Sequence, residues 1–150
     1  VWLEGKEAKF DNRFHKTYES PAKLVGVIFT HVGEGTAAPY ECRNSDHWIF
    51  NGTGLKNGDK FGEKSLHERV PGGASGHETD KRTPNTGEGF ISLAMGCNPG
   101  EDSGAEMVYK DFPGKGGQVF STGSITYISC LLVDESISRI TKNVLNKFLQ

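Results

Sequence analysis

The sequence lacks several features that would assign a protein to a class at once. No apolar run approaches the roughly 18 residues of a membrane-spanning helix. Basic and acidic residues are nearly balanced, 17 against 19, and they are interspersed along the chain. The formal net charge of -2 therefore provides no basic patch for nucleic acid or for an anionic membrane. We expect a soluble protein that binds neither.

Cysteine is also scarce. The 3 cysteines, Cys42, Cys97 and Cys130, are odd in number, widely spaced and without a Cys-x-x-Cys pair. This pattern argues against a disulfide framework and against a zinc site. A reducing, cytoplasmic location is the simpler interpretation.

The length of 150 residues fits one domain, which would bury about 70% of the surface of its unfolded chain. Because the first residue is Val1 and no signal-like apolar stretch accompanies it, we expect a processed chain or a piece of a longer one. We divide the chain into an N-terminal arm or linker, residues 1–22, and one domain, residues 23–150. Large apolar residues that could anchor the arm are Trp2, Phe10, Phe14 and Tyr18.

Apolar runs predict the strands. Continuous runs at Lys23–Thr30, Phe90–Met95 and Ser129–Val133 indicate strands buried on both faces, as in an α/β sheet. A short strand is expected at Leu66–Val70. The stretch Asp46–Thr53 indicates either a strand or the end of a helix, and Gly123–Leu132 either a loop or a strand.

The last third of the chain carries the clearest local signals. The apolar stretches Ala105–Phe112 and Gly117–Thr122 flank Pro113–Gly116, which predicts a hairpin. After it, apolar residues recur with helical spacing over Asp134–Leu149, which predicts an amphipathic helix capped by Asp134. The residues of its apolar face are Ile137, Ile140, Val144, Leu145 and Phe148.

The segment Pro71–Arg82 is where we look first for chemistry. Its three glycines allow sharp turns, and His77, Glu78 and Asp80 then bring three ionisable groups together. In an extended chain Glu78 and Asp80 would point to one side, and His77 and Thr79 to the other. Spacing leaves two interpretations: an active-site loop, or a surface turn in which the two carboxylates pair with Lys81 and Arg82.

Other polar residues are weaker candidates. The Gly-rich segment after the first predicted strand contains His31, Glu34 and Tyr40, at a place where open α/β sheets bind ligands. Tyr40 and Arg43 could line the same pocket or belong to a surface loop. The histidines show no metal-ligand spacing, and we expect Cys42 and Cys130 to be small buried side chains.

Six stretches, taken in order, resemble a known family. They are Leu24–Val27, Ser45–Phe50 with Gly52, Gly72–Asp80, Ala105–Val108, Gly117–Ile125, and Ile137–Thr141 with Asn143–Leu145. Together they resemble the C-terminal part of the large (beta) subunit of N,N-dimethylformamidase. The resemblance covers most of the chain from Lys23 onward, and the first 22 residues match it poorly. Its most specific parts are the Gly-Gly-Ala-Ser-Gly-x-Glu-x-Asp loop and the ending of hairpin and helix.

The resemblance implies a fold and an activity. The fold would be α/β: a three-layer α/β/α, class I glutamine amidotransferase-like (flavodoxin-like) arrangement, rich in strands and closed by an amphipathic helix. The activity would be that of an amidohydrolase that splits N-substituted formamides, such as dimethylformamide, into an amine and formate. The family uses iron held by two tyrosinates and a carboxylate. We expect these ligands to lie outside this chain, so that it has no metal ligands of its own and is inactive by itself.

The resemblance also selects residues. It carries the loop carboxylate onto Glu78, as a residue that reaches the iron pocket. We assign Glu78 the catalytic role of taking a proton from an iron-bound water and passing it to the leaving amine. Supporting or substrate-binding roles are expected for Gly76, His77, Asp80, Tyr40 and Arg43. No nucleophile-elbow cysteine is evident, which argues against glutaminase chemistry.

Two non-enzymatic interpretations remain. The chain could be a structural or oligomerisation module, or a small-ligand-binding domain on the same fold, because a fold does not determine a function. The partners implied by the resemblance are a small amide substrate, the remainder of the large subunit, a small subunit and further copies in a homo-oligomer.

Overall fold

The computed structural model describes residues 20–30, 32–114 and 116–150. Most of the expected N-terminal arm therefore lies outside the described residues. In the described part, the main element is an antiparallel sheet with the strand order β4-β3-β7-β8-β9. Its strands are β3 (Tyr40–Cys42), β4 (Lys60–Phe61), β7 (Ile91–Gly96), β8 (Glu106–Phe112) and β9 (Gly117–Ser121).

The predicted hairpin is confirmed. Strands β8 and β9 pair from Val108 opposite Ser121 to Phe112 opposite Gly117, on either side of the Pro-Gly turn. The predicted strand at Phe90–Met95 is confirmed as β7, which pairs with β8 on one side and β3 on the other.

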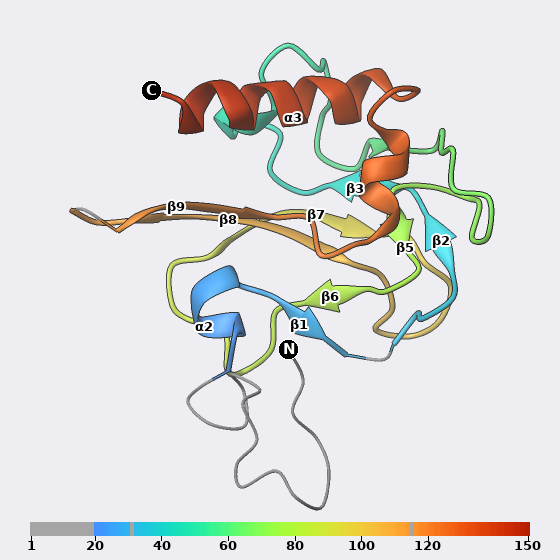
Figure 1. Ribbon diagram of the computed structural model, residues 1–150, viewed down its shortest axis with the longest axis horizontal. Coiled ribbons are helices and arrows are strands. Elements are labelled where there is room, and N and C mark those ends of the chain that lie inside the picture. Colours follow the sequence, from blue (N-terminus) through green and yellow to red (C-terminus); the bar gives the residue numbers. More distant parts are fainter. Residues whose placement is uncertain (1–19, 31, 115) are drawn as a thin grey trace, which may run out of the picture.

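The predicted C-terminal helix is also confirmed, as α3 (Glu135–Phe148). The Asp134 carboxylate accepts a hydrogen bond from the Ile137 N–H (3.1 Å), so it caps the helix. Ile137, Ile140 and Val144 are buried, whereas Leu145 and Phe148 at the end of the helix are exposed. Helix α3 lies over one face of the five-stranded sheet (Figure 1), and the main core fills the space between them.

Two 3-10 helices complete this layer. For Asp46–Thr53 the sequence allowed a strand or the end of a helix. The structure has a short 3-10 helix there, η1 (Trp48–Phe50). The Asn143 side chain of α3 fastens η1 by donating to the Ile49 and Asn51 carbonyls, both at 2.8 Å. The second 3-10 helix, η2 (Thr126–Cys130), follows β9, so the predicted strand at Ser129–Val133 is wrong.

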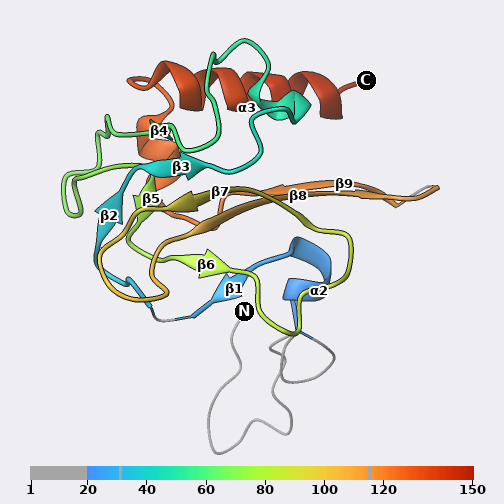
Figure 2. The same cartoon turned by 180° about the vertical axis from the view of Figure 1, so that it is seen from behind.

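A thinner layer covers the opposite face of the sheet. There α2 (Ala22–Val25) leads into β1 (Ile28–Phe29), which pairs with β6 (Asp80–Lys81). Figures 1 and 2 both show this ribbon on the side of the sheet away from α3. A small second core of Val27, Phe90 and Val108 joins the two layers. Near the sheet edge, β2 (Ala37–Ala38) pairs with β5 (Ser75–Gly76).

The predicted strand at Lys23–Thr30 is wrong for most of its length. Gly26 adopts φ 85° and its N–H bonds to the Ala22 carbonyl, which ends the helical turn of α2 and leaves only Ile28–Phe29 as a strand. A Cβ at Gly26 would lie 2.5 Å from the Phe90 ring, so the close approach also requires glycine. Leu66–Val70 is not a strand either.

The described residues thus form an α/β structure that is rich in strands and has a C-terminal helix. Each pairing between its named strands is antiparallel, so these strands include no parallel pair. No helix in the described part of the chain is long and apolar enough to cross a membrane.

Candidate functional site

The segment Pro71–Arg82 adopts no single extended conformation but contributes to two sheets. Its first part, Ser75–Gly76, pairs with β2, and Asp80–Lys81 pairs with β1. Glycine is required where the segment passes β2, because a Cβ at Gly73 would lie 2.4 Å from the Ala38 carbonyl carbon and one at Gly76 2.3 Å from the Thr36 carbonyl oxygen.

His77 marks the junction between the two parts. It has φ 66°, which is uncommon for a residue other than glycine, and its backbone bonds to Thr36 and Gly35. Its ring lies against that of His67, with 5.5 Å between the ring centroids. His77 does not line the pocket that contains Glu78.

Glu78 and Asp80 line one pocket of about 300 Å³. They therefore share a side of the chain, as alternation predicted, although His77 interrupts the extended backbone. The other lining residues come from the end of α2 and from the connection between β9 and η2: Val25, Val27, Ser121, Thr122, Gly123, Ser124 and Ile125.

The two carboxylates have different surroundings. Glu78 is exposed, whereas Asp80 is half-buried on β6. Burial, and secondly the charge of Glu78, raises the pKa of the Asp80 carboxyl above its ordinary value. Its Oδ1 atom is buried and has no hydrogen-bond partner. The pocket thus joins an accessible carboxylate to a carboxyl group that keeps its proton to higher pH.

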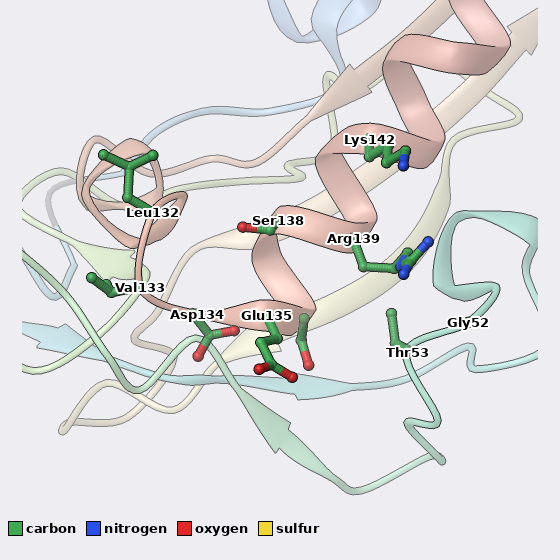
Figure 3. A pocket seen from close by; sticks show the side chains of 10 residues that line it. Gly52, Thr53, Leu132, Val133, Asp134, Glu135, Ser138, Arg139 and Lys142 are labelled. Carbon is green, nitrogen blue, oxygen red and sulfur yellow. The ribbon is translucent and has the colours of Figure 1, made fainter.

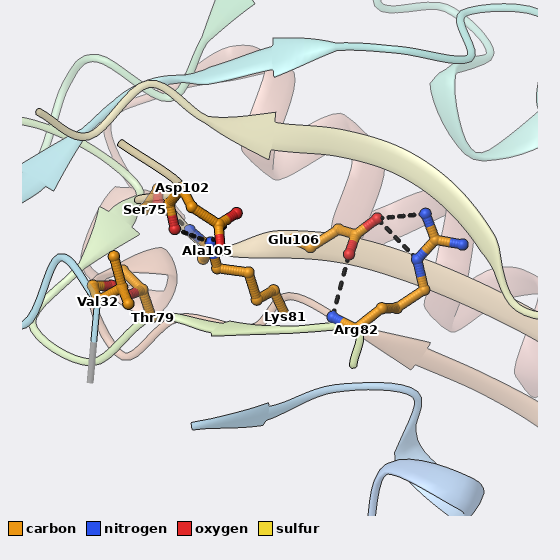
Figure 4. A network of polar contacts seen from close by, with 8 residues as sticks. All are labelled: Val32, Ser75, Thr79, Lys81, Arg82, Asp102, Ala105 and Glu106. Carbon is orange, nitrogen blue, oxygen red and sulfur yellow. Dashed lines mark hydrogen bonds and ion pairs between the residues drawn. The ribbon is translucent and has the colours of Figure 1, made fainter. Parts of the chain in front are cut away.

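The neighbouring cations, Lys81 and Arg82, pair with other carboxylates (Figure 4). The Lys81 ammonium donates to the Asp102 carboxylate (3.1 Å) and to the Asp102 carbonyl. The Arg82 guanidinium lies 2.7 Å from the Glu106 carboxylate. The surface-turn interpretation, in which Lys81 and Arg82 neutralise Glu78 and Asp80, is therefore wrong.

Glu106 is a buried charge with a structural partner. Burial would raise the pKa of its carboxyl, but the hydrogen bonds from the Arg82 side chain, Ser92 and the Arg82 N–H, with the charge of Arg82, outweigh burial and lower it. The carboxylate accepts from Arg82 Nε (2.8 Å) and from the Arg82 N–H (3.1 Å). This pair fixes the chain directly after β6 to β8.

A buried polar network beside the site was not anticipated from the sequence. The Asn98 amide donates to the Ser75 carbonyl (3.0 Å) and to Thr36 Oγ1 (2.8 Å). The Ser75 hydroxyl bonds to Asn98 Oδ1 (2.6 Å) and accepts from the Ala105 N–H (2.9 Å). These bonds hold Ser75–Gly76 against the loop after β7. The only sequence signal was an asparagine next to Pro99.

Tyr40 and Arg43 do not line the Glu78 pocket. Tyr40 begins β3 rather than lying in a loop, is fully buried, and donates from its hydroxyl to the Thr122 carbonyl (2.6 Å). It therefore supports the floor of the pocket from within the core. Arg43 is exposed and pairs with Glu41 at 3.2 Å. Of the other candidates, Glu34 is exposed, and His31 lies outside the described residues.

A larger pocket of about 520 Å³ lies against the first turns of α3 (Figure 3). Arg139 and Lys142 project from the helix toward the side of Thr53, and Asp134 and Glu135 lie at the start of the helix. All four charged side chains line an open, polar site. Its half-buried carboxylate, Asp134, accepts hydrogen bonds from the Ile137 and Gly62 N–H groups, whereas Asp80 Oδ1 in the Glu78 pocket is buried without a partner, so the smaller pocket is the better candidate.

A known family matches most of the chain. The family described as N,N-dimethylformamidase beta subunit-like, C-terminal, matches residues 4–141. The chain belongs to this family. The match includes most of residues 1–22, where the motifs showed little resemblance. No curated protein matches the chain.

The resemblance implied iron, with ligands expected outside this chain. Within residues 20–30, 32–114 and 116–150, no group of three or more His, Cys, Asp or Glu side chains is arranged to hold a metal ion. Burial also raises the pKa of the Tyr40, Tyr109 and Tyr127 hydroxyls. The Tyr40 hydroxyl bonds to the Thr122 carbonyl (2.6 Å) and the Tyr127 hydroxyl to Thr141 Oγ1 (2.9 Å), so these two buried tyrosines do not fit a pair of tyrosinate ligands. Tyr18 lies outside them.

Proposed function

We propose that this domain takes part in hydrolysing the C–N bond of N-substituted formamides, as in the conversion of dimethylformamide to dimethylamine and formate. The observation that carries the proposal is the pocket in which the exposed Glu78 carboxylate stands beside the half-buried Asp80. Membership of the dimethylformamidase family supports the reaction class. The role of the individual residues rests on their geometry.

The role we assign to Glu78 is that of a proton shuttle. Its carboxylate accepts a proton from the attacking water, whose oxygen bonds to the formyl carbon. As the C–N bond breaks, the same group returns the proton to the amine nitrogen. Glu78 suits this role because it is exposed at the pocket while its backbone is held between two short strand pairs.

Other parts of the proposal come from the resemblance. Iron and its ligands would be supplied from outside the described residues. The partners would be the small amide substrate, the rest of the large subunit, a small subunit and further copies in a homo-oligomer, and the family description does name a beta subunit. A cytoplasmic location is supported by three unpaired cysteines. The class I glutamine amidotransferase-like, three-layer architecture also comes from the resemblance: the closing hairpin and helix agree with it, whereas the antiparallel pairing of the described strands does not.

The test is Glu78→Gln in the longest natural form of the protein. We expect the loss of formamide hydrolysis by at least about 100-fold, with assembly unchanged, because glutamine cannot exchange the proton. Glu88→Gln is the matched control, since Glu88 is exposed and does not line the pocket. Turnover at the wild-type rate in Glu78→Gln would refute the proposal. Metal analysis of the same long form tests the iron.

A structural or oligomerisation module is the second candidate. One observation favours it: Ile125, Ile128 and Leu132, in and beside η2, are 44%, 70% and 88% exposed, although they are large and apolar. In this alternative Glu78→Gln would have no effect, and replacing Ile128 and Leu132 by serine would dissociate the assembly. A small-ligand-binding domain on the same fold would bind its ligand without turnover.

A further inference from the structure

The described residues do not compensate the charge of the Glu78 pocket. Two carboxyl groups line it, and the cations that follow them in the sequence are engaged with Asp102 and Glu106. Among the described residues, neither Glu78 nor Asp80 forms an ion pair. Two adjacent negative charges of this kind repel each other, and the repulsion is strongest where one group is shielded from water.

The hydroxyl groups of the pocket do not relieve this repulsion. Ser121 Oγ donates to the Val25 carbonyl (2.6 Å), and Ser124 Oγ donates to the Gly76 carbonyl (3.1 Å). Beneath the pocket, Tyr40 donates to the Thr122 carbonyl rather than to a carboxylate. The protein thus provides the buried Asp80 Oδ1 with no donor.

Asp80 cannot leave this environment by a small movement of the backbone. Its N–H donates to the Gly123 carbonyl (2.7 Å), and it lies opposite Phe29 in the β1–β6 ribbon. Its chain is therefore fixed on both sides. A carboxyl group held there, with one oxygen buried and unpartnered, lowers the cost of its burial when it binds a proton.

We propose that Asp80 is a positioning residue for the proposed reaction, which holds a proton beside the Glu78 carboxylate so that the two side chains carry one negative charge instead of two. The pair begins each cycle with one proton, on Asp80. It gains a second when Glu78 takes the proton of water, and it returns to one when Glu78 gives that proton to the amine nitrogen. Asp80 acts through Glu78, and this inference rests on the function proposed for Glu78.

The other titratable groups around Asp80 are consistent with a pair that titrates together. Tyr40, on β3, is neutral because burial raises the pKa of its hydroxyl well above 10.0. Lys81 and Arg82 face their own carboxylates. Glu106, on the adjacent strand β8, is neutralised by Arg82. Among the described residues, Glu78 is therefore the charged group left to couple with Asp80.

The first experiment measures the titration of Asp80 directly and needs no enzymatic assay. In the whole chain, the carboxyl carbon of Asp80 is followed by NMR as the pH is varied, with the exposed Asp111 as an internal reference. We expect Asp80 to titrate at higher pH than Asp111, and its midpoint to shift to lower pH in Glu78→Gln, because the neighbouring charge is lost. Glu88→Gln should leave the midpoint in place. An Asp80 midpoint equal to that of Asp111, or unmoved by Glu78→Gln, would overturn the inference.

The second experiment uses the longest natural form of the protein. We expect the profile of kcat/KM against pH for Asp80→Asn, where asparagine imitates the protonated acid, to contain one ionisation fewer than that of the wild type. A purely structural role would lower kcat/KM equally at all pH values, which would contradict the proposal. If Glu78→Gln is fully active, the proposed function fails, while the Asp80 titration still decides whether the two groups are coupled.

Discussion

At the scale of single residues, the pocket depends on close contacts that only glycine permits. Gly123 has φ 67°, and a Cβ there would lie 2.5 Å from the Asp80 carbonyl oxygen and 2.8 Å from that of Glu106. Both carbonyl oxygens belong to strand backbones, so they cannot shift unless β6 or β8 also moves. Gly123 therefore sets how closely the connection after β9 approaches the Asp80 strand.

We predict that Gly123→Ala destabilises the protein by about 3 kcal/mol, from the strain of a positive φ together with the backbone clash. Gly114→Ala is the control, because Gly114 has φ 70° and no atom lies within 4 Å of the position that its Cβ would take. That variant should cost about 1 kcal/mol, from strain only. Chemical denaturation measures both free energies of unfolding. Equal losses of unfolding free energy in the two variants would show that the backbone contact at Gly123 adds nothing to the strain of its positive φ.

Single residues also show how far the sequence could predict the site. Alternation correctly placed Glu78 and Asp80 on one side, because it depends on local geometry. It could not show that Lys81 and Arg82 pair with Asp102 and Glu106, since those partners lie 21 and 24 residues away. The charge imbalance of the pocket is therefore a property that only the tertiary structure reveals.

At the scale of elements, the sequence correctly predicted those helices and strands whose formation depends on neighbouring residues in the chain. The hairpin depends on the Pro-Gly turn, and α3 on its cap and apolar spacing, and both were correctly predicted. The segment Lys23–Thr30 was mistaken because an apolar run does not distinguish a strand from a helical turn. In α2, Leu24 and Val25 are exposed rather than buried. Gly26 decided the outcome by taking a left-handed conformation and ending α2.

Asp134 joins helix α3 to the sheet. Its Oδ1 caps Ile137 and its Oδ2 accepts from the Gly62 N–H at 3.1 Å, directly after β4. We predict that Asp134→Ala lowers the free energy of unfolding by about 2 kcal/mol, because a cap is lost and a part-buried N–H loses its acceptor. Glu135→Ala, in the same first turn but exposed, should cost about 0.5 kcal/mol. Thermal or urea unfolding that ranks the two variants in the reverse order would contradict this assignment.

At the scale of the whole molecule, the stability of the fold depends on pH through two carboxyl groups, Glu106 and Asp80. Their contributions change with pH in opposite directions. The lowered pKa of Glu106 means that its stabilisation is present above the ordinary value of 4.5 and is lost as the pH falls through its folded value. The raised pKa of Asp80 means that its contribution is present below 3.8 and is lost as the pH rises through its folded value.

We predict that Glu106→Gln is less stable than the wild type by about 2 kcal/mol at neutral pH, and that this difference shrinks as the pH falls below 4.5. Asp80→Asn should behave in the opposite sense and gain stability relative to the wild type as the pH rises above 3.8. Urea denaturation at a series of pH values measures both differences. Parallel curves for all three proteins would show that neither carboxyl group changes its proton affinity on folding.

The hydrogen bond from Ser121 to the Val25 carbonyl has a consequence for how the protein reaches its native state. It spans 96 residues, while the pairing of Phe29 with Asp80 closes a further long loop. Contacts at such separations incur a large entropic cost before they gain stability, so they form slowly. The β8–β9 hairpin has no such delay. We expect amides of the hairpin to become protected early in refolding, and those around Asp80 among the last, so that the carboxyl pair is assembled only when the rest of the chain has already folded.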